Sequence, residues 1–386
     1  MPDLPALPAH EWIDRPEQLP ALGERLRTCP WLALDCEANS MFVYRERLCL
    51  LQLNVAGALV VVDPLPLLKA EGWDGSTPSK ILEPLRAGLE RTDRRLWLHG
   101  GEYDCSLIRR DFAINLGGVW DTQQAASMLG WEQSGYGAVV AKTLGIQLAK
   151  AHAQEDWGQR PLGTEVIRYA LDDVLHLPAA GEILAKAVID ADIEEEHAIA
   201  NTAVAATTSH FGFDPAGMWK IKGMREVPRS HLGVLLALYI WRDGLAKLAD
   251  KPPGRLINNE VLLVLARHAP TSFQQLKLSG IHGRIMSAHG DELMKIIKEA
   301  KSKPLNLPDP PRLREVADGE EKLEDRLKDW RRAEAANRKV PLQVVLPAKA
   351  LDHIKRHGAG ELSSVPQLGP KRIRLYGAKL LDLCRA

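Results

Sequence analysis

Cysteine is scarce in this sequence. The 386 residues include only five cysteines, and no two of them form a Cys-x-x-Cys pair: Cys29, Cys36, Cys49, Cys105 and Cys384. An odd number of cysteines without paired spacing excludes a disulfide framework and argues against a zinc cluster. This usage favours a reducing compartment, so we expect a cytoplasmic protein.

Long hydrophobic runs are also missing. No apolar stretch approaches the roughly 20 residues that a membrane-spanning helix needs. The first residues, MPDLPALPAHEWIDRPEQLP, lack the basic start and apolar core of a secretory signal. With 45% hydrophobic and 26% charged residues, the composition is that of an ordinary globular protein. We therefore expect no membrane partner, and we expect a monomer.

The net charge at pH 7 is zero, but the charges are unevenly distributed. Residues 301–386 contain 19 lysines and arginines against 12 acidic residues, which leaves 31 against 38 in the first 300 residues. A basic C-terminal segment behind an acidic body favours a polyanionic partner. The surplus of seven positive charges is smaller than in a dedicated nucleic-acid-binding arm.

The first half of the chain alternates short apolar strands with helices. Strands are predicted at 31–35, 48–55, 58–63 and 95–100, and the first three are close enough in sequence for an antiparallel meander. Helices are predicted at 79–90, 102–112, 121–130 (with Asp121 as N-cap) and 164–190. This pattern predicts an α/β domain over residues 1–200, with a mixed sheet flanked by helices.

Beyond residue 200 the sequence predicts only helices. A linker is expected at 201–228, followed by two small all-α domains at 229–302 and 319–386, with a proline-rich linker at 303–318 between them. Both helical segments have a Trp-Arg helix, a proline before an apolar turn, a short helix and a glycine-containing turn before the last helix. This shared order indicates that the two segments are copies of one repeated domain.

Five polar residues in the first half stand out by their spacing. Asp35 and Glu37 end the first predicted strand and project from the same face, where two like charges resist burial unless a cation intervenes. Asp104 follows the fourth strand in the first turn of a helix, where an acid also complements the helix dipole. Tyr169 and Asp173 lie four residues apart and share one helical face.

Together these residues predict a metal site. Each feature has an ordinary explanation by itself, but four carboxylates in one pocket require counter-charge, which hard divalent cations supply. Two such ions about 3.5–4 Å apart activate a water and stabilise the leaving oxygen in phosphodiester hydrolysis. Tyr169, beside Asp173, would then orient the attacking water.

The order and spacing of these motifs resemble the ribonuclease D family, DEDDy-type 3′→5′ exoribonucleases with a ribonuclease H-like exonuclease domain followed by two HRDC domains. The resemblance covers nearly the whole chain and includes Asp35-x-Glu37 followed by RLCLLQL, His99-x-x-x-x-Asp104, DTQQAASMLG, and EDWGQRPL ahead of Tyr169-x-x-x-Asp173. It implies two Mg²⁺ or Mn²⁺ ions. Asp35 would bridge both ions, Glu37 and Asp173 would complete one site, and Asp104 would support the other.

The resemblance also implies a substrate. We expect nucleotides to be removed from single-stranded 3′ ends of RNA, such as tRNA precursors and other small structured RNAs, with release of nucleoside 5′-monophosphates. Two alternatives remain open: a DNA exonuclease of the same fold, because the metal site does not read the 2′-hydroxyl, and a non-catalytic nucleic-acid-binding protein. The candidate phosphate contacts are Arg160, Lys371, Arg372, Arg374 and Lys379.

For several residues near these motifs we expect structural roles or departures from the family pattern. Cys36 and Ala38 depart from the family pattern, where a Thr and a larger apolar residue are common, so Ala38 puts a contact with the terminal base in doubt. His99 is expected to be a core residue, and Asp172 a solvated acid. Trp157, Arg160 and Pro161 are expected to shape the loop before the long helix. The helical domains are expected to capture RNA, unless one merely packs on the nuclease domain.

Overall fold

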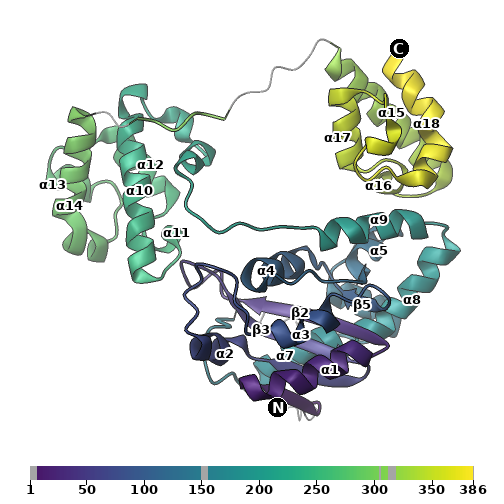
Figure 1. Ribbon diagram of the computed structural model, residues 1–386. Coiled ribbons are helices and arrows are strands. Elements are labelled where there is room, and N and C mark those ends of the chain that lie inside the picture. Colours follow the sequence, from purple (N-terminus) through teal and green to yellow (C-terminus); the bar gives the residue numbers. More distant parts are fainter. Residues whose placement is uncertain (1–6, 149–154, 304–305, 312–318, 386) are drawn as a thin grey trace. The chain divides into compact units, whose positions relative to one another are not determined.

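The computed structural model of the protein describes residues 7–148, 155–303, 306–311 and 319–385 (Figure 1). A six-stranded sheet with the strand order β1-β4-β3-β2-β5-β6 organises the N-terminal half. Its strands are β1 (His10–Ile13), β2 (Trp31–Ala38), β3 (Leu48–Val55), β4 (Ala58–Val62), β5 (Arg95–Leu98) and β6 (Val119–Asp121).

The sheet is mixed, as the sequence predicts. Strands β2, β3 and β4 form the expected antiparallel meander, whereas β1 pairs with β4, and β5 with β2 and β6, in parallel. The edge strands β1 and β6 were not predicted, because four and three residues are too few to show an alternating pattern. All eight residues of β3 are buried, since helices cover both faces of the sheet.

Nine helices accompany the sheet among the described residues. They are α1 (Leu19–Thr28), α2 (Pro64–Glu71), α3 (Glu83–Leu89), α4 (Glu102–Phe112), α5 (Thr122–Met128), α6 (Tyr136–Leu144), α7 (Thr164–Leu175), α8 (Leu177–Asp190) and α9 (Glu194–Ala205). Helices α1, α3 and α4 contribute to the core on one face of the sheet, and α7 packs against β2, β3 and β4 on the other. The amide of Asn54 on β3 donates to the Val174 carbonyl (3.1 Å) and ties α7 to the sheet.

The prediction of one long helix over 164–190 was wrong. The chain forms α7 and α8 instead, with a break at His176 between them. Pro178 lies in the first turn of α8, where its missing N–H costs nothing. Within one continuous helix the same proline would remove a hydrogen bond and clash with the carbonyl four residues earlier.

The chain divides into two compact units. The first comprises Met1–Ala38, Leu48–Ser209 and Glu315–Ala386, and therefore contains both the sheet and the C-terminal helical domain. The second comprises Asn39–Arg47 and His210–Arg314. Of the predicted linker 303–318, residues 304–305 and 312–318 lie outside the described part of the chain.

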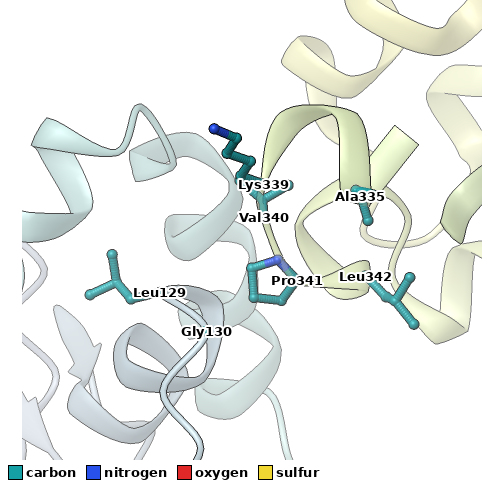
Figure 2. A pocket seen from close by; sticks show the side chains of 8 residues that line it. Leu129, Gly130, Ala335, Lys339, Val340, Pro341 and Leu342 are labelled. Carbon is teal, nitrogen blue, oxygen red and sulfur yellow. The ribbon is translucent and has the colours of Figure 1, made fainter. Parts of the chain in front are cut away.

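The C-terminal helical domain shares hydrophobic core with the α/β domain. Its helices are α15 (Glu320–Arg338), α16 (Leu342–Val345), α17 (Ala348–His357) and α18 (Gly369–Arg385). Val344 is fully buried in a cluster with residues of α5, α6 and α8. Beside it, Pro341 faces Leu129 and Gly130 across a groove of about 500 Å³ (Figure 2), and the Gln343 amide donates to the Ser127 carbonyl (3.1 Å). The expectation that one helical domain packs on the nuclease domain therefore describes this one.

The second unit holds the other helical domain. Its helices are α10 (Leu232–Ala249), α11 (Pro253–Leu256), α12 (Asn259–His268), α13 (Phe273–Lys277) and α14 (Gly283–Ser302). They enclose a separate hydrophobic core. Within the described ranges of the whole chain, no helix is both long and apolar enough to cross a lipid bilayer.

Candidate active site

Strand β2 places the first two acids on the face of the sheet that α7 covers. Asp35 and Glu37 are two residues apart and so share this face. Asp35 lies directly opposite Gln52 of β3, and the register shifts immediately after Glu37. The acids thus lie where β2 is about to leave the sheet.

Helix α7 brings the third acid to the first two. Ligand oxygens of Asp35, Glu37 and Asp173 all lie within 4.8 Å of one another, close enough to hold one cation. Asp172, the next residue, is half-buried and is not part of this group. Helical periodicity therefore selects Asp173, and not its neighbour, for the site.

Asp104 reaches the same region from the first turn of α4. It is 5% exposed and accepts a hydrogen bond from the Cys36 thiol on β2. It lies outside the group of three, but its charge raises the pKa of Glu37. The start of α4 is held by buried Asp121, whose carboxylate accepts from the Gly101 amide (2.7 Å). Gly101 itself is required by packing, because a Cβ there would lie 2.5 Å from the Leu98 side chain.

The electrostatics of these carboxylates are unusual. Burial is the largest cause that raises the pKa of each of the four. The pKa of Asp35 rises to about 7, and that of Glu37, next to the other three acids, rises to about 10. Burial and the charge of Asp35 hold the pKa values of Asp104 and Asp173 well above their usual range. Without a cation, these groups resist ionisation at neutral pH.

The donor set fits divalent cations. Carboxylate oxygens are ligands of hard ions such as Mg²⁺ and Mn²⁺, and bound cations reverse the pKa shifts that burial imposes. The fully buried Gln52 amide, opposite Asp35, has no hydrogen-bond partner for either terminal atom. A buried amide without partners beside an acid cluster is expected where ligands or their ordered water complete the site.

Two tyrosines border the acids. Tyr169 lies one helical turn before Asp173, and burial together with the charge of Asp173 raises its pKa, so its hydroxyl stays protonated. Tyr136 of α6 is partly buried and donates to the Asp172 carbonyl (2.8 Å), and burial together with the charges of Asp173 and Asp35 raises its pKa. Its ring also contacts His99 edge-on, with 5.3 Å between the ring centroids. Tyr169 is partly exposed, and Tyr136 supports the helix.

Comparison with known proteins assigns this arrangement to a family. Residues 10–188 match the family model described as a 3′-5′ exonuclease, and residues 231–297 and 320–384 each match the HRDC domain. Curated relatives named ribonuclease D are 31% identical over 316 residues in Granulibacter bethesdensis (80% of this chain, 76% of the relative) and 30% identical over 386 residues in Zymomonas mobilis (97% and 94%). The chain belongs to the ribonuclease D family.

Solved structures agree with the fold. The crystal structure of Escherichia coli RNase D, an exoribonuclease involved in structured RNA processing, is 23% identical and aligns with a TM-score of 0.72 over 98% of this chain and 99% of that one. A protein from Bifidobacterium adolescentis is 20% identical, with a TM-score of 0.78 over the full length of both chains. The α/β exonuclease domain and two helical HRDC domains are thus the architecture of this family member.

Arg160 stabilises the fold of this ribonuclease D family member through contacts inside the protein. Its guanidinium forms an ion pair with buried Asp63 (2.6 Å) and donates to the Cys49 carbonyl (2.8 Å). It also bonds the carbonyl of Trp157, which is 2% exposed. These contacts fix the loop before α7, as the sequence suggested, and they leave the guanidinium less available for a phosphate.

The C-terminal cations likewise hold the domain in place. Arg372 is 2% exposed, and its guanidinium donates to four carbonyls, those of Gln343, Val344, Gln367 and Leu368. Lys371 pairs with Asp192 and Glu196 at α9. Arg374 is exposed and lies 3.8 Å from Glu195. A phosphate role for Arg372 conflicts with this burial, because its donors are already used inside the protein.

Sequence reasoning missed three residues that support the site: Asp121 as the anchor of α4, Gln52 opposite Asp35, and Tyr136, which is bonded to α7 at Asp172. Asp121 was predicted as the N-cap of α5, and its carboxylate does accept from the Gln123 and Gln124 amides. Its second bond, to Gly101, spans 20 residues and has no local sequence signal. Gln52 could have been found from strand register alone, since it follows from pairing β2 with β3.

Proposed function

We propose that this chain trims RNA from the 3′ end by a two-metal-ion mechanism and that its substrates are tRNA precursors and other small structured RNAs. As a ribonuclease D family member it is a hydrolytic 3′–5′ exoribonuclease with a nucleic-acid partner. The observation that best supports the mechanism is the partly buried group of Asp35, Glu37 and Asp173, with buried Asp104 in the same region.

In this proposal the acids divide between two cation sites. Asp35 contributes to both, Glu37 and Asp173 complete one, and Asp104 supports the other. When bound, Mg²⁺ or Mn²⁺ ions would supply the positive charge that makes a water nucleophilic and stabilises the leaving oxygen. The low exposure and mutual repulsion of these carboxylates explain why the charge is needed, because both raise their pKa values and disfavour full ionisation at neutral pH.

Tyr169 would orient the attacking water. Its hydroxyl remains a donor across the physiological pH range because its pKa is raised. The turn of helix between Tyr169 and Asp173 sets the hydroxyl beside a metal-binding carboxylate. Hydrolysis at the terminal phosphodiester bond then releases a nucleoside 5′-monophosphate.

The substrate class is supported by the domain architecture. The E. coli protein of the same fold is described as acting in structured RNA processing, and the HRDC domains are nucleic-acid-associated modules that match at residues 231–297 and 320–384. We propose that the helical domains expected at 229–302 and 319–386 are the two nucleic-acid-associated modules, and that the protein acts as a cytoplasmic monomer.

A labelled RNA ladder tests the proposal. RNA carrying the label at its 5′ end should shorten one nucleotide at a time with Mg²⁺ or Mn²⁺, whereas a 3′ label should appear at once as a mononucleotide. A chelator should abolish both patterns. Release of internal fragments, or degradation that continues in the chelator, would contradict the proposal.

Two neighbouring acids provide a matched pair of variants. Asp173→Asn should remove activity, whereas Asp172→Asn should retain it, because only Asp173 belongs to the acid group. RNA binding that persists in both variants, without degradation by the wild type, would favour a binding protein instead. Rates on RNA and DNA of identical sequence separate an exoribonuclease from a DNA exonuclease.

A further inference from the structure

A pocket in the second unit gathers aromatic side chains that the exonuclease chemistry does not use. It has a volume of about 550 Å³, and its ring side chains include Tyr44, Phe211, Phe213 and Tyr239. The whole sequence has only five phenylalanines and six tyrosines, so four of eleven such residues line this pocket. We call it the aromatic pocket.

The rings are arranged in two contacting pairs. Tyr44 and Phe211 meet edge-on, with 5.4 Å between centroids, and Phe213 and Tyr239 lie 5.2 Å apart and inclined by 35°. Phe211 is 39% exposed, although a phenylalanine that serves only packing is normally buried. Exposed rings beside a cavity offer flat faces on which a planar ligand can stack.

The polar groups around the rings are largely fixed. Arg242 is buried and donates to the Ile257 carbonyl (2.8 Å) and the Asn259 side chain (2.9 Å), while its guanidinium lies over the Tyr239 ring. The Tyr44 hydroxyl donates to Asp243 (2.8 Å). These contacts hold both tyrosines in place, so the pocket is formed before any ligand binds.

The aromatic pocket carries charges of both signs: Asp214 and Asp243 line it but accept hydrogen bonds from the Ala216 amide and the Tyr44 hydroxyl, whereas Lys220 is not engaged in this way. Lys220 lines the pocket, is exposed, and forms no ion pair with any described residue. His210, another residue that lines the pocket, is exposed. The guanidinium carbon of Arg45 lies 5.2 Å from the centroid of the Phe211 ring. Rings that accept a base, bordered by cations that accept a phosphate, are the combination by which proteins hold single-stranded nucleic acid.

The segment that carries Tyr44 also connects the pocket to the catalytic strand. Asn39–Arg47 belongs to the second unit and directly follows β2, so Tyr44 is seven residues along the chain from Glu37. Asp250 of α10 accepts from the Tyr44 amide (3.2 Å) and pairs with Arg47 (3.5 Å), which fastens this segment to the helical domain. Seven residues of chain thus lead from Glu37 to the first ring of the pocket.

We propose that the aromatic pocket binds a nucleotide of the single-stranded RNA substrate upstream of its 3′ terminus, with the base stacked on Phe211 and its neighbouring rings. This inference rests on the proposed exonuclease function. The pocket would add affinity for chains long enough to occupy it and the acid site together. It would do so for any base, because every base offers a flat face.

The test uses full-length protein with Asp173→Asn to keep the RNA intact. Affinity for oligoribonucleotides of 2 to 12 nucleotides should rise at one length, and Phe211→Ala should remove that rise, weakening the longer chains at least about fivefold. Phe211→Trp should preserve it. Phe273→Ala is the control, since Phe273 is 48% exposed in the same unit but outside the pocket.

A fluorescent base analogue locates the contact. With 2-aminopurine moved one position at a time from the 3′ end, one internal position should be quenched by stacking, and Phe211→Ala should restore its emission. Equal affinities for Phe211→Ala and Phe273→Ala at every length would overturn the proposal, as would quenching that does not depend on Phe211. Tight binding of free AMP with no dependence on RNA length would also overturn it, in favour of a mononucleotide site.

Digestion of a trinucleotide by protein that keeps Asp173 tests the pocket proposal separately from the exonuclease proposal. If the wild type and Phe211→Ala degrade a trinucleotide at the same rate, the acid site works without the pocket. If no RNA of any length is degraded, the exonuclease proposal fails by itself. Normal degradation with no effect of Phe211 on length dependence rejects only the pocket.

Discussion

Removing divalent cations should make the α/β domain less stable as the pH rises above neutrality. The reason is Glu37, whose pKa is raised from 4.5 to about 10 by burial and by the charge of Asp35. A carboxyl group with a raised pKa binds more protons in the folded than in the unfolded chain. Its favourable contribution is complete below pH 4.5 and is lost as the pH rises toward 10.

The magnitude follows from proton linkage. Between pH 6.5 and 8.5 Glu37 is ionised in the unfolded chain and protonated in the folded one. The free energy of unfolding should therefore fall by about 1.4 kcal/mol per pH unit, or about 3 kcal/mol over this window. Asp104 and Asp173, whose pKa values are also raised, act in the same direction.

Asp35, whose pKa is raised to about 7, also titrates inside this window and adds to the fall in stability, whereas His99 and Cys36 act mainly outside it. Burial lowers the pKa of His99 from 6.5 to about 4, so its contribution to stability grows with pH and is complete at about pH 6.5. The buried Cys36 thiol, with an ordinary pKa of 9.0 that burial raises, lowers stability only at higher pH. The interval from pH 6.5 to 8.5 therefore reports mainly on the carboxylates.

Urea unfolding at pH 6.5, 7.5 and 8.5 measures the effect, with a chelator and with saturating Mn²⁺. The chelated wild type should lose stability with pH, Mn²⁺ should abolish the loss, and Glu37→Gln should reduce the slope without metal, while the other raised carboxyl groups keep part of it. Asp172→Asn should keep the wild-type slope. An identical slope for Glu37→Gln and the wild type, or no response to Mn²⁺, would refute the electrostatic reasoning.

Three further substitutions probe separate parts of the molecule. Tyr169→Phe should slow single-turnover RNA cleavage about 10- to 100-fold while RNA affinity stays constant, because it removes only a water-orienting hydroxyl; a proportional loss of affinity would contradict that role. Gly181→Ala should destabilise α8 by about 1–3 kcal/mol in urea unfolding, since its Cβ would lie 2.5 Å from the Trp97 ring; unchanged stability would mean that the ring moves freely. Val344→Asp should make the C-terminal helical domain sensitive to limited proteolysis, because it places a charge in a shared core; wild-type resistance would show that the contact contributes little.

The sequence was informative wherever the chemistry depends on local periodicity. Alternation along β2 places Asp35 and Glu37 on one face, and the helical repeat places Tyr169 and Asp173 together. The cap at Asp121 was predicted for the same reason, since its partners are two and three residues away. The antiparallel meander was predictable too, because its connections are short.

The tertiary structure alone decided which distant groups meet. The same amino-acid types have different fates: Arg372 is buried and bonded to four carbonyls, while Arg374, two residues later, is exposed. Asp121, at the end of β6, accepts a hydrogen bond from Gly101 and so holds the start of the helix that carries Asp104. Burial and long-range contact depend on how strands and helices from separate parts of the chain pack together. Local spacing determines the direction in which a side chain points from its own helix or strand. Packing determines which other groups it contacts and whether it is buried.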